Sequence, residues 1–204
     1  MTEAILEARH LRKEFGGLVA VADVSIVITR GTTHSIIGPN GAGKTTLFNL
    51  LNGKYHPTRG QVILNGEDIT NTPVYRRVHK GMGRSFQITN IFPNLTVLEN
   101  VRLAAQALGK SNYRFLRRAD SFKTYIQRAE EALDIVGLAP MAYSPANVLP
   151  HGGKRKLELA IILAGDPEIL LLDEPTAGMA SEQVPELIET IGAIRRKGGK
   201  TIVM

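Results

Sequence analysis

The amino-acid sequence predicts an α/β fold with a mostly parallel central sheet, an N-terminal antiparallel β subdomain and an inserted α-helical subdomain. Three patterns lead to this class. Short runs of β-forming residues dominate the first part of the chain. Residues 169–172 form the continuous apolar run typical of a parallel strand covered on both faces. In residues 88–164 helical patterns replace the strand patterns. We expect one domain over residues 1–204, with residues 1–87 and 165–204 as the α/β core and the helical segment as the inserted subdomain.

The composition is that of a folded globular chain. Of its 204 residues 43% are hydrophobic, which is enough to bury one substantial core with a smaller subdomain attached. There is no cysteine, so a disulfide framework and thiolate metal sites are excluded. The sequence contains no apolar run long enough to cross a bilayer and no basic-then-apolar leader, so we expect no membrane span, no export and a cytoplasmic setting.

The formal net charge of +6 suits nucleic acid, an anionic membrane surface or a polyphosphate ligand. No basic stretch is interleaved with aromatic residues in the manner of single-strand binders. The basic residues are scattered, and we interpret most of their small clusters as solvated helix faces. These clusters lie at residues 76–77, 117–118, 154–156 and 195–197.

The N-terminal part is predicted to contain strands and two helices. Strands are predicted at 5–11 and 22–29, and the second shows Val24, Ile26 and Ile28 on one face by alternation. Further strands are expected at residues 32–37, 61–64 and 83–87, with a helix at 47–51 and a short basic helix that Pro73 opens.

Helix signals dominate the rest of the chain. Thr96 and Glu99 have the spacing of a capping box, and Gly109 and Gly137 are expected to end two successive helices. A helix over 152–164 precedes the apolar strand. Ser181 is expected to cap a last helix before a strand at 200–204, and the inward stripe of that helix comprises Val184, Leu187, Ile188, Ile191 and Ile194.

Residues 38–45 match the pattern G-x-x-x-x-G-K-[ST] at a predicted strand-to-helix turn, which defines a phosphate-binding loop, or Walker A motif. Its glycines allow successive N–H groups to approach a phosphate chain, and the following helix adds the positive end of its dipole. Lys44 would supply a full charge to the outer phosphates, and the Thr45 hydroxyl would ligate Mg²⁺. The predicted nucleotide-binding residues here are Gly38, Pro39, Asn40, Gly41, Ala42, Gly43, Lys44, Thr45 and Thr46. The predicted core is therefore that of a P-loop NTPase.

Two acidic residues, Asp173 and Glu174, end the predicted buried strand. Ligands bind at the carboxyl edge of open parallel sheets, and the phosphate loop also follows a strand. We therefore interpret Asp173 as a Walker B acid that holds Mg²⁺ through water, and Glu174 as the base that accepts a proton from the attacking water. The alternative, a strand ending in solvated carboxylates, is favoured only if the upstream loop is ignored.

Three further positions are candidates. Phe15 lies beside two glycines upstream of the loop and could stack on a base, although a core or turn position is the alternative. Gln87 follows a strand and leads into the helical segment, where its amide could contact a metal-bound water; an ordinary boundary glutamine is the alternative. Gly152 and Gly153 open a helix with positive charge, a second possible anion site that suggests a neighbouring copy's nucleotide and hence a dimer.

Together these residues resemble the ATP-binding subunits of ABC transporters. Phe15 is similar to the adenine-stacking aromatic residue, Gln87 in the segment RSFQ matches the Q-loop, and residues 149–153 lie where the signature motif belongs. Residues 169–174 match the Walker B motif with its adjacent glutamate, and the order and spacing agree from end to end. Within the family, residues 86–97 and the signature region look like those of importers of branched-chain amino acids; urea or short-amide importers are close relatives.

The resemblance implies the cofactors ATP and Mg²⁺ and a role for each site residue. Glu174, Gln87 and Lys44 would act in catalysis, and Thr45, Gln87 and Asp173 at the metal. Leu149, Gly152 and Gly153 would bind the nucleotide of a second ATPase subunit, identical or different. It also implies membrane permease subunits that contact the helical subdomain and Q-loop, an indirect link to a periplasmic or extracellular solute-binding protein, and a peripheral place on the cytoplasmic side of the membrane.

The chain departs from the family pattern in three places. Pro150 replaces the signature serine and lacks both its hydroxyl and an N–H group, and Ala180 stands where the D-loop usually carries Asp or Asn. The chain stops at Met204, before the family's switch histidine, so we expect a C-terminally truncated subunit that binds ATP but hydrolyses it poorly.

Two other functions compete with the importer. One is a soluble ABC ATPase that acts on nucleic acid or ribosomes; such assemblies generally need a second nucleotide domain or a long coiled coil, so we expect no nucleic-acid partner. The other is a nucleotide-binding regulator without turnover, which Pro150 and Ala180 favour.

Overall fold

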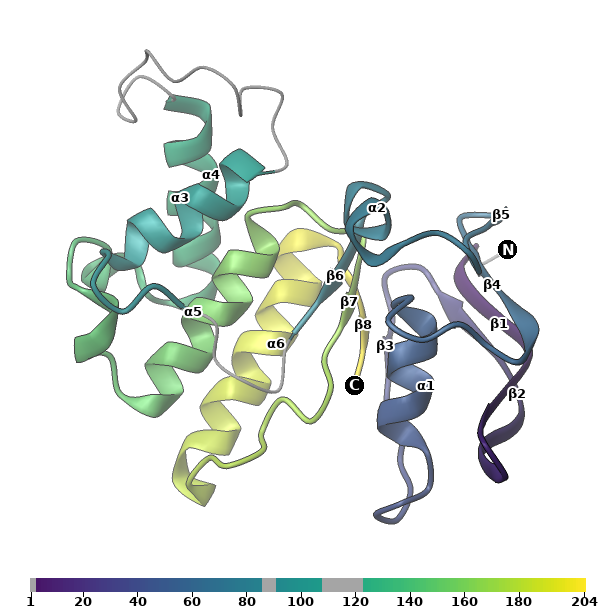
Figure 1. Ribbon diagram of the computed structural model, residues 1–204. Helices are drawn as coiled ribbons and strands as arrows, with labels where there is room; N and C mark the ends of the chain where they lie inside the picture. Colours follow the sequence, from purple (N-terminus) through teal and green to yellow (C-terminus); the bar gives the residue numbers. More distant parts are fainter. Residues whose placement is uncertain (1–2, 86–90, 108–122) are drawn as a thin grey trace. The chain divides into compact units, whose positions relative to one another are not determined.

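The computed structural model describes residues 3–85, 91–107 and 123–204 (Figure 1). It divides into two compact units. The first unit comprises Met1–Arg84, Glu168–Asp173 and Lys200–Met204, and the second comprises Ser85–Pro167 and Glu174–Gly199. The last long helix therefore groups with the helical segment, whereas the sequence analysis assigned it to the α/β core.

The first unit contains an antiparallel sheet with the strand order β2-β1-β4-β5. The strands are β1 (Ala4–Phe15), β2 (Leu18–Thr29), β4 (Arg59–Leu64) and β5 (Glu67–Asp68). The first two form a hairpin around Gly16, which has a positive φ of 57°. Both strands predicted here are confirmed, and each extends beyond its predicted range because cross-strand pairing continues to the hairpin turn.

A parallel sheet completes the first unit, with the order β3-β8-β7-β6. Its strands are β3 (Thr33–His34), β8 (Thr201–Val203), β7 (Ile169–Leu171) and β6 (Met82–Arg84). All three residues of β7 are buried between its two neighbours, which confirms the parallel strand predicted there. Strand β3 is shorter than the predicted strand at 32–37, although the amide of Ile36 still donates to the carbonyl of Met204 at 2.6 Å. Ile37 is then exposed just before the phosphate loop.

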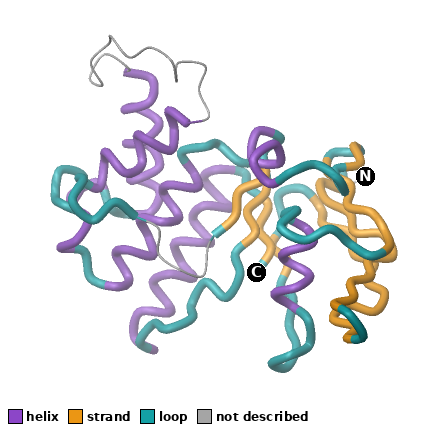
Figure 2. The backbone as a smooth tube through the Cα atoms, in the orientation of Figure 1, coloured by secondary structure: helices purple, strands orange, loops and turns teal. Residues whose placement is uncertain are grey.

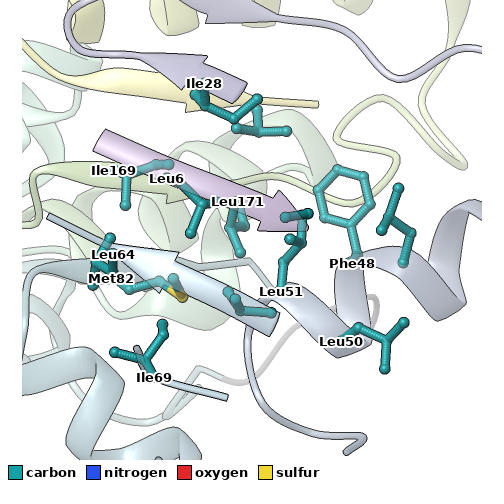
Figure 3. Packing of buried hydrophobic residues seen from close by; sticks show 14 of the residues in the cluster. Leu6, Ile28, Phe48, Leu50, Leu51, Leu64, Ile69, Met82, Ile169 and Leu171 are labelled. Carbon is teal, nitrogen blue, oxygen red and sulfur yellow. The ribbon is translucent and has the colours of Figure 1, made fainter. Parts of the chain in front are cut away.

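Helix α1 (Lys44–Leu51) supplies the apolar side chains that join these two sheets into one core. Figure 3 shows Phe48, Leu50 and Leu51 from the helix beside residues of both sheets. Leu6 and Leu64 come from the antiparallel sheet. Burial of these side chains holds the helix, and with it the loop that precedes it, in place.

Helix α2 (Val74–His79) contradicts the interpretation of residues 76–77 as a solvated basic cluster. Arg76 is exposed, but Arg77 is only 1% exposed. Its guanidinium donates to five backbone carbonyls at 2.6 to 3.3 Å. Burial lowers the pKa of Arg77 to about 10. The acceptors are the carbonyls of Leu50, Leu51, Ile69, Thr70 and Thr72.

The second unit consists of helices joined by loops and short 3-10 turns, while strands β1 to β8 all belong to the first unit (Figure 2). The helices are α3 (Val97–Ala107), α4 (Lys123–Val136), α5 (His151–Leu163) and α6 (Val184–Gly198). The Thr96 half of the predicted capping box is confirmed, since its Oγ1 accepts the amide of Glu99 at 3.1 Å, whereas the Glu99 carboxylate accepts from Arg102.

The cap predicted at Ser181 is wrong. Ser181 begins a separate 3-10 turn, and α6 starts after Gln183 with no side-chain cap. Pro185 in its first turn already has the backbone angle that a helix start needs. The predicted inward stripe is also wrong at Ile188, which is 44% exposed because it lies at the edge of the buried face that Leu187 shares.

Candidate functional site

The phosphate loop ends in a helix whose N-terminus is open. Gly41 and Gly43 have positive φ angles of 82° and 86°, so the loop takes turns that other residues adopt only with strain. Gly43 is the N-cap of α1 and supplies no side-chain cap, and the first turn of the helix carries no acidic residue. The amides of Lys44, Thr45 and Thr46 have no acceptor within the helix by geometry and are available to an anion.

Lys44 adds a full positive charge to this loop. Its Nζ donates to the carbonyl of Gly38 at 2.8 Å and to that of Pro39 at 2.9 Å. The side chain thus folds back over the loop from the first helical turn. The ammonium group lies where the loop amides and the positive end of the helix dipole also act, which is the arrangement that binds phosphate groups.

Gly43 brings the loop against the antiparallel sheet. A Cβ at this position would lie 2.3 Å from the carbonyl oxygen of Ala20 on β2. Phe15 is 42% exposed, so it is not a core residue, but it lies directly at the hairpin turn, which is the other alternative given for it. Tyr55 contacts its ring edge-on at a centroid distance of 5.3 Å, and the Nζ of Lys13 lies 5.0 Å from its centroid.

Asp173 follows β7 and is 2% exposed. Strand β8 lies between β7 and β3, the strand that leads to the phosphate loop, and the strands are parallel, so Asp173 and the loop are at the same edge of the sheet. Among the described residues no three His, Cys, Asp or Glu side chains form a metal-binding group. A carboxylate and a hydroxyl are the kinds of oxygen ligand that Mg²⁺ takes together with phosphate, so the side chains of Asp173 and Thr45 are chemically suited to this ion.

Two polar residues at this edge, Asn49 and Arg84, were not predicted from the sequence. Nη2 of Arg84, the last residue of β6, donates to Oδ1 of Asn49 at 2.8 Å. Burial lowers the pKa of Arg84, and the Asp173 carboxylate opposes that shift. Asn49 is a buried amide on α1, four residues after Thr45 and hence on the same helix face. Asn49 is a polar residue among the apolar residues of α1, and this was the feature of the sequence from which a functional role could have been predicted.

Glu174 belongs to the second unit, and its side chain is exposed. Its φ of 46° lies in the left-handed region, which is unusual for a residue with a side chain. Its carbonyl accepts the amide of Ala177 at 3.0 Å and Nη2 of Arg155 at 3.4 Å. Gln87, the third predicted catalytic residue, lies outside the described residues.

The predicted signature residues surround the start of α5. Leu149 is buried, and Pro150 is the N-cap without a side-chain hydrogen bond. A Cβ on Gly153 would lie 3.3 Å from Cδ of Pro150, and one on Gly152 would lie 3.5 Å from Oε1 of Gln183. The helix start has neither a side-chain cap nor an acidic residue in its first turn, so its first amides are not capped by a side chain.

A glycine-rich loop with its lysine, an open helix N-terminus and an acidic residue at one carboxyl edge define a P-loop nucleotide-binding protein. Residues 21–177 match the family model described as ABC transporter. The chain belongs to this family of ATP-binding proteins, whose members are ATPases that couple ATP hydrolysis to transport.

Two curated relatives span the whole chain. The high-affinity branched-chain amino acid transport ATP-binding protein LivG of Escherichia coli K12 is 36% identical over 209 residues, covering 100% of this chain and 82% of the relative. The corresponding protein BraF of Pseudomonas aeruginosa is 36% identical over 213 residues, with the same shares.

Solved structures of ATP-binding cassettes share the fold. The ADP conformation of MJ1267, a cassette of an ABC transporter, superposes with a TM-score of 0.87 at 29% identity and covers 99% of this chain and 81% of that chain. The dimeric post-hydrolysis state of MJ0796 bound to ADP and Pi superposes with a TM-score of 0.78 at 27% identity and covers 98% of this chain and 86% of that chain. Within the described parts of this chain, every helix is too short or too polar to span a bilayer.

Proposed function

We propose that this chain powers an importer of branched-chain amino acids from the cytoplasmic face of the cell membrane. The observation that carries the proposal is the phosphate loop on α1, with Lys44 folded over it and Asp173 at the same sheet edge. Support for the solute comes from LivG and BraF, both named for branched-chain amino acid transport and both matched along the whole chain.

In this proposal each of the chain's site residues has a separate role in the binding or hydrolysis of ATP. The loop amides and Lys44 hold the phosphates and stabilise the charge that develops during hydrolysis. Thr45 and Asp173 would hold Mg²⁺, which when bound neutralises phosphate charge. Glu174 accepts the proton of the attacking water, and its exposure leaves the carboxylate accessible. Phe15, which is 42% exposed, would stack on the base.

We infer a dimer with a second ATPase subunit, in which the helix start at Leu149, Gly152 and Gly153 faces the partner's nucleotide. The open N-terminus of α5 suits an anion, and the related cassette MJ0796 was solved as a dimer with ADP and Pi. Permease subunits would dock on the helical subdomain and the Gln87 segment. The solute-binding protein would act on them from the other side of the membrane.

Replacing Glu174 with glutamine is expected to leave ATP affinity within about two-fold while lowering turnover by about 100-fold or more, because the amide binds no proton at neutral pH. Phosphate release measures turnover, and titration with a fluorescent ATP analogue measures affinity. The matched control is Glu189→Gln, which removes an exposed carboxylate from α6 and should change neither.

Turnover in Glu174→Gln equal to that of the control would remove Glu174 as the base. The transport role is tested separately, by co-expression with candidate permease subunits of a branched-chain amino acid importer. Retention of the chain on the purified permease, with ATP-dependent uptake of leucine into vesicles, is the expected result. Uptake of urea or short amides in place of leucine would reassign the solute.

A further inference from the structure

Arg155 connects helix α5 to the main chain of the proposed catalytic segment. It is only 9% exposed. Its Nε donates to the carbonyl of Pro175 at 2.9 Å, and its Nη2 donates to that of Glu174 at 3.4 Å. All three residues lie within the second unit. Arg155 was part of the cluster 154–156 interpreted as a solvated face, and its burial corrects that interpretation as well.

A buried carboxylate keeps the Arg155 cation in place. Nη1 of Arg155 donates to Oε2 of Glu158 at 2.6 Å, and Glu158 is also buried. The other oxygen, Oε1, is buried and has no hydrogen-bond partner in the described parts of the chain. Nη1 of the planar guanidinium bonds Glu158, while Nε and Nη2 reach the separate carbonyls of Pro175 and Glu174. A lysine, with a single nitrogen, cannot reproduce this fork.

The segment that Arg155 holds has an unfavourable backbone. Glu174 has a φ of 46°, and such a conformation persists in a non-glycine residue only where the surroundings enforce it. The next residue, Pro175, has no amide to donate. The turn is closed by the amide of Ala177 on the Glu174 carbonyl, and Arg155 adds two hydrogen bonds from outside the turn.

We propose that Arg155 is the positioning residue of the hydrolytic step. Its guanidinium fixes the carbonyls of Glu174 and Pro175, and thereby the direction in which the exposed Glu174 carboxylate leaves the main chain. This inference rests on the proposed role of Glu174 as the base. Small errors in the placement of a catalytic group cost about 100-fold in rate, so one buried cation can matter without touching the substrate.

The test separates the ion pair with Glu158 from the hydrogen bonds to the carbonyls of Glu174 and Pro175. In the double variant Arg155→Met/Glu158→Met, the ion pair is replaced by apolar side chains of similar length, so no buried charge is left unpaired. The matched control, Glu158→Gln, keeps a side-chain oxygen that can still accept a hydrogen bond from Nη1, so we expect Arg155 to stay on the carbonyls. We expect the double variant to lose about 10- to 100-fold in kcat with ATP affinity within about two-fold, and the control to keep kcat within about three-fold.

Hydrogen exchange provides a readout that does not depend on turnover. The amides of residues 176–178 should exchange at least about ten-fold faster in the double variant than in the control, while those of α1 stay unchanged. If the double variant does not fold, the variant Arg155→Lys is used to test the proposal. Its lysine keeps a cation for Glu158 but cannot bind both carbonyls. The same faster exchange and lower kcat are expected of it.

The possible failures are distinguishable. Unchanged kcat and unchanged exchange at 176–178 in the variants, together with an inactive Glu174→Gln, would overturn the role of Arg155 and leave the proposed function standing. Full turnover in Glu174→Gln would overturn the proposed function itself. Equal losses of ATP affinity and kcat in the Arg155 variants would also contradict positioning, since they indicate general damage to the site.

Discussion

Replacing Lys44 with alanine is expected to lower ATP affinity by about 10- to 100-fold, because each charge-assisted hydrogen bond to a phosphate contributes roughly 1.5 to 3 kcal/mol. The ammonium already lies on the loop, bonded to the Gly38 and Pro39 carbonyls, so little ordering is needed when phosphate arrives. Hydrolysis should fall further than affinity, since charge on the phosphates grows in the transition state. Calorimetric titration with ATP measures the first effect, and phosphate release the second.

The control for this substitution is Lys54→Ala. Lys54 is exposed and follows the other end of α1, so its removal changes the net charge equally without touching the loop. ATP affinity should stay within about two-fold, since an exposed charge at that distance is largely screened by salt. If Lys44→Ala bound ATP as tightly as Lys54→Ala, the loop would not be the phosphate site.

The second large effect is on folding. Arg77→Met should lower the free energy of unfolding by about 3 to 5 kcal/mol, because five carbonyls that the guanidinium serves lose their donor inside the protein. Two of them, from Leu50 and Leu51, are at the C-terminal end of α1, where a cation also complements the helix dipole. Urea denaturation followed by circular dichroism measures the loss.

Arg76→Met is a matched control one residue away. Arg76 is exposed and lies 5.8 Å from the Tyr75 ring centroid, so its removal should cost no more than about 0.5 kcal/mol. Arg77→Lys should recover only part of the loss, because a single ammonium group cannot reach five carbonyls. Equal midpoints for the Arg76 and Arg77 variants would show that the buried hydrogen bonds contribute little to stability.

The phosphate loop could be predicted from the sequence because its chemistry is local. A strand, the glycines, Lys44 and the helix follow one another along the chain, and the positive φ angles of Gly41 and Gly43 are those that the loop requires. The buried strand before Asp173 was equally plain, since a parallel strand covered on both faces leaves a continuous apolar run. These segments determine a nucleotide-binding α/β protein.

The sequence by itself thus determined the class of protein and the order of its motifs, while the tertiary structure decided which polar side chains support them. Arg76 and Arg77 are neighbours of the same type, yet only the second is buried, because its acceptors come from the end of α1 and from residues 69–72. Arg155 likewise meets Glu174 and Pro175 across a gap of 19 and 20 residues. The burial of a residue depends on which distant segments pack over it, and this cannot be predicted from the residues next to it in the sequence.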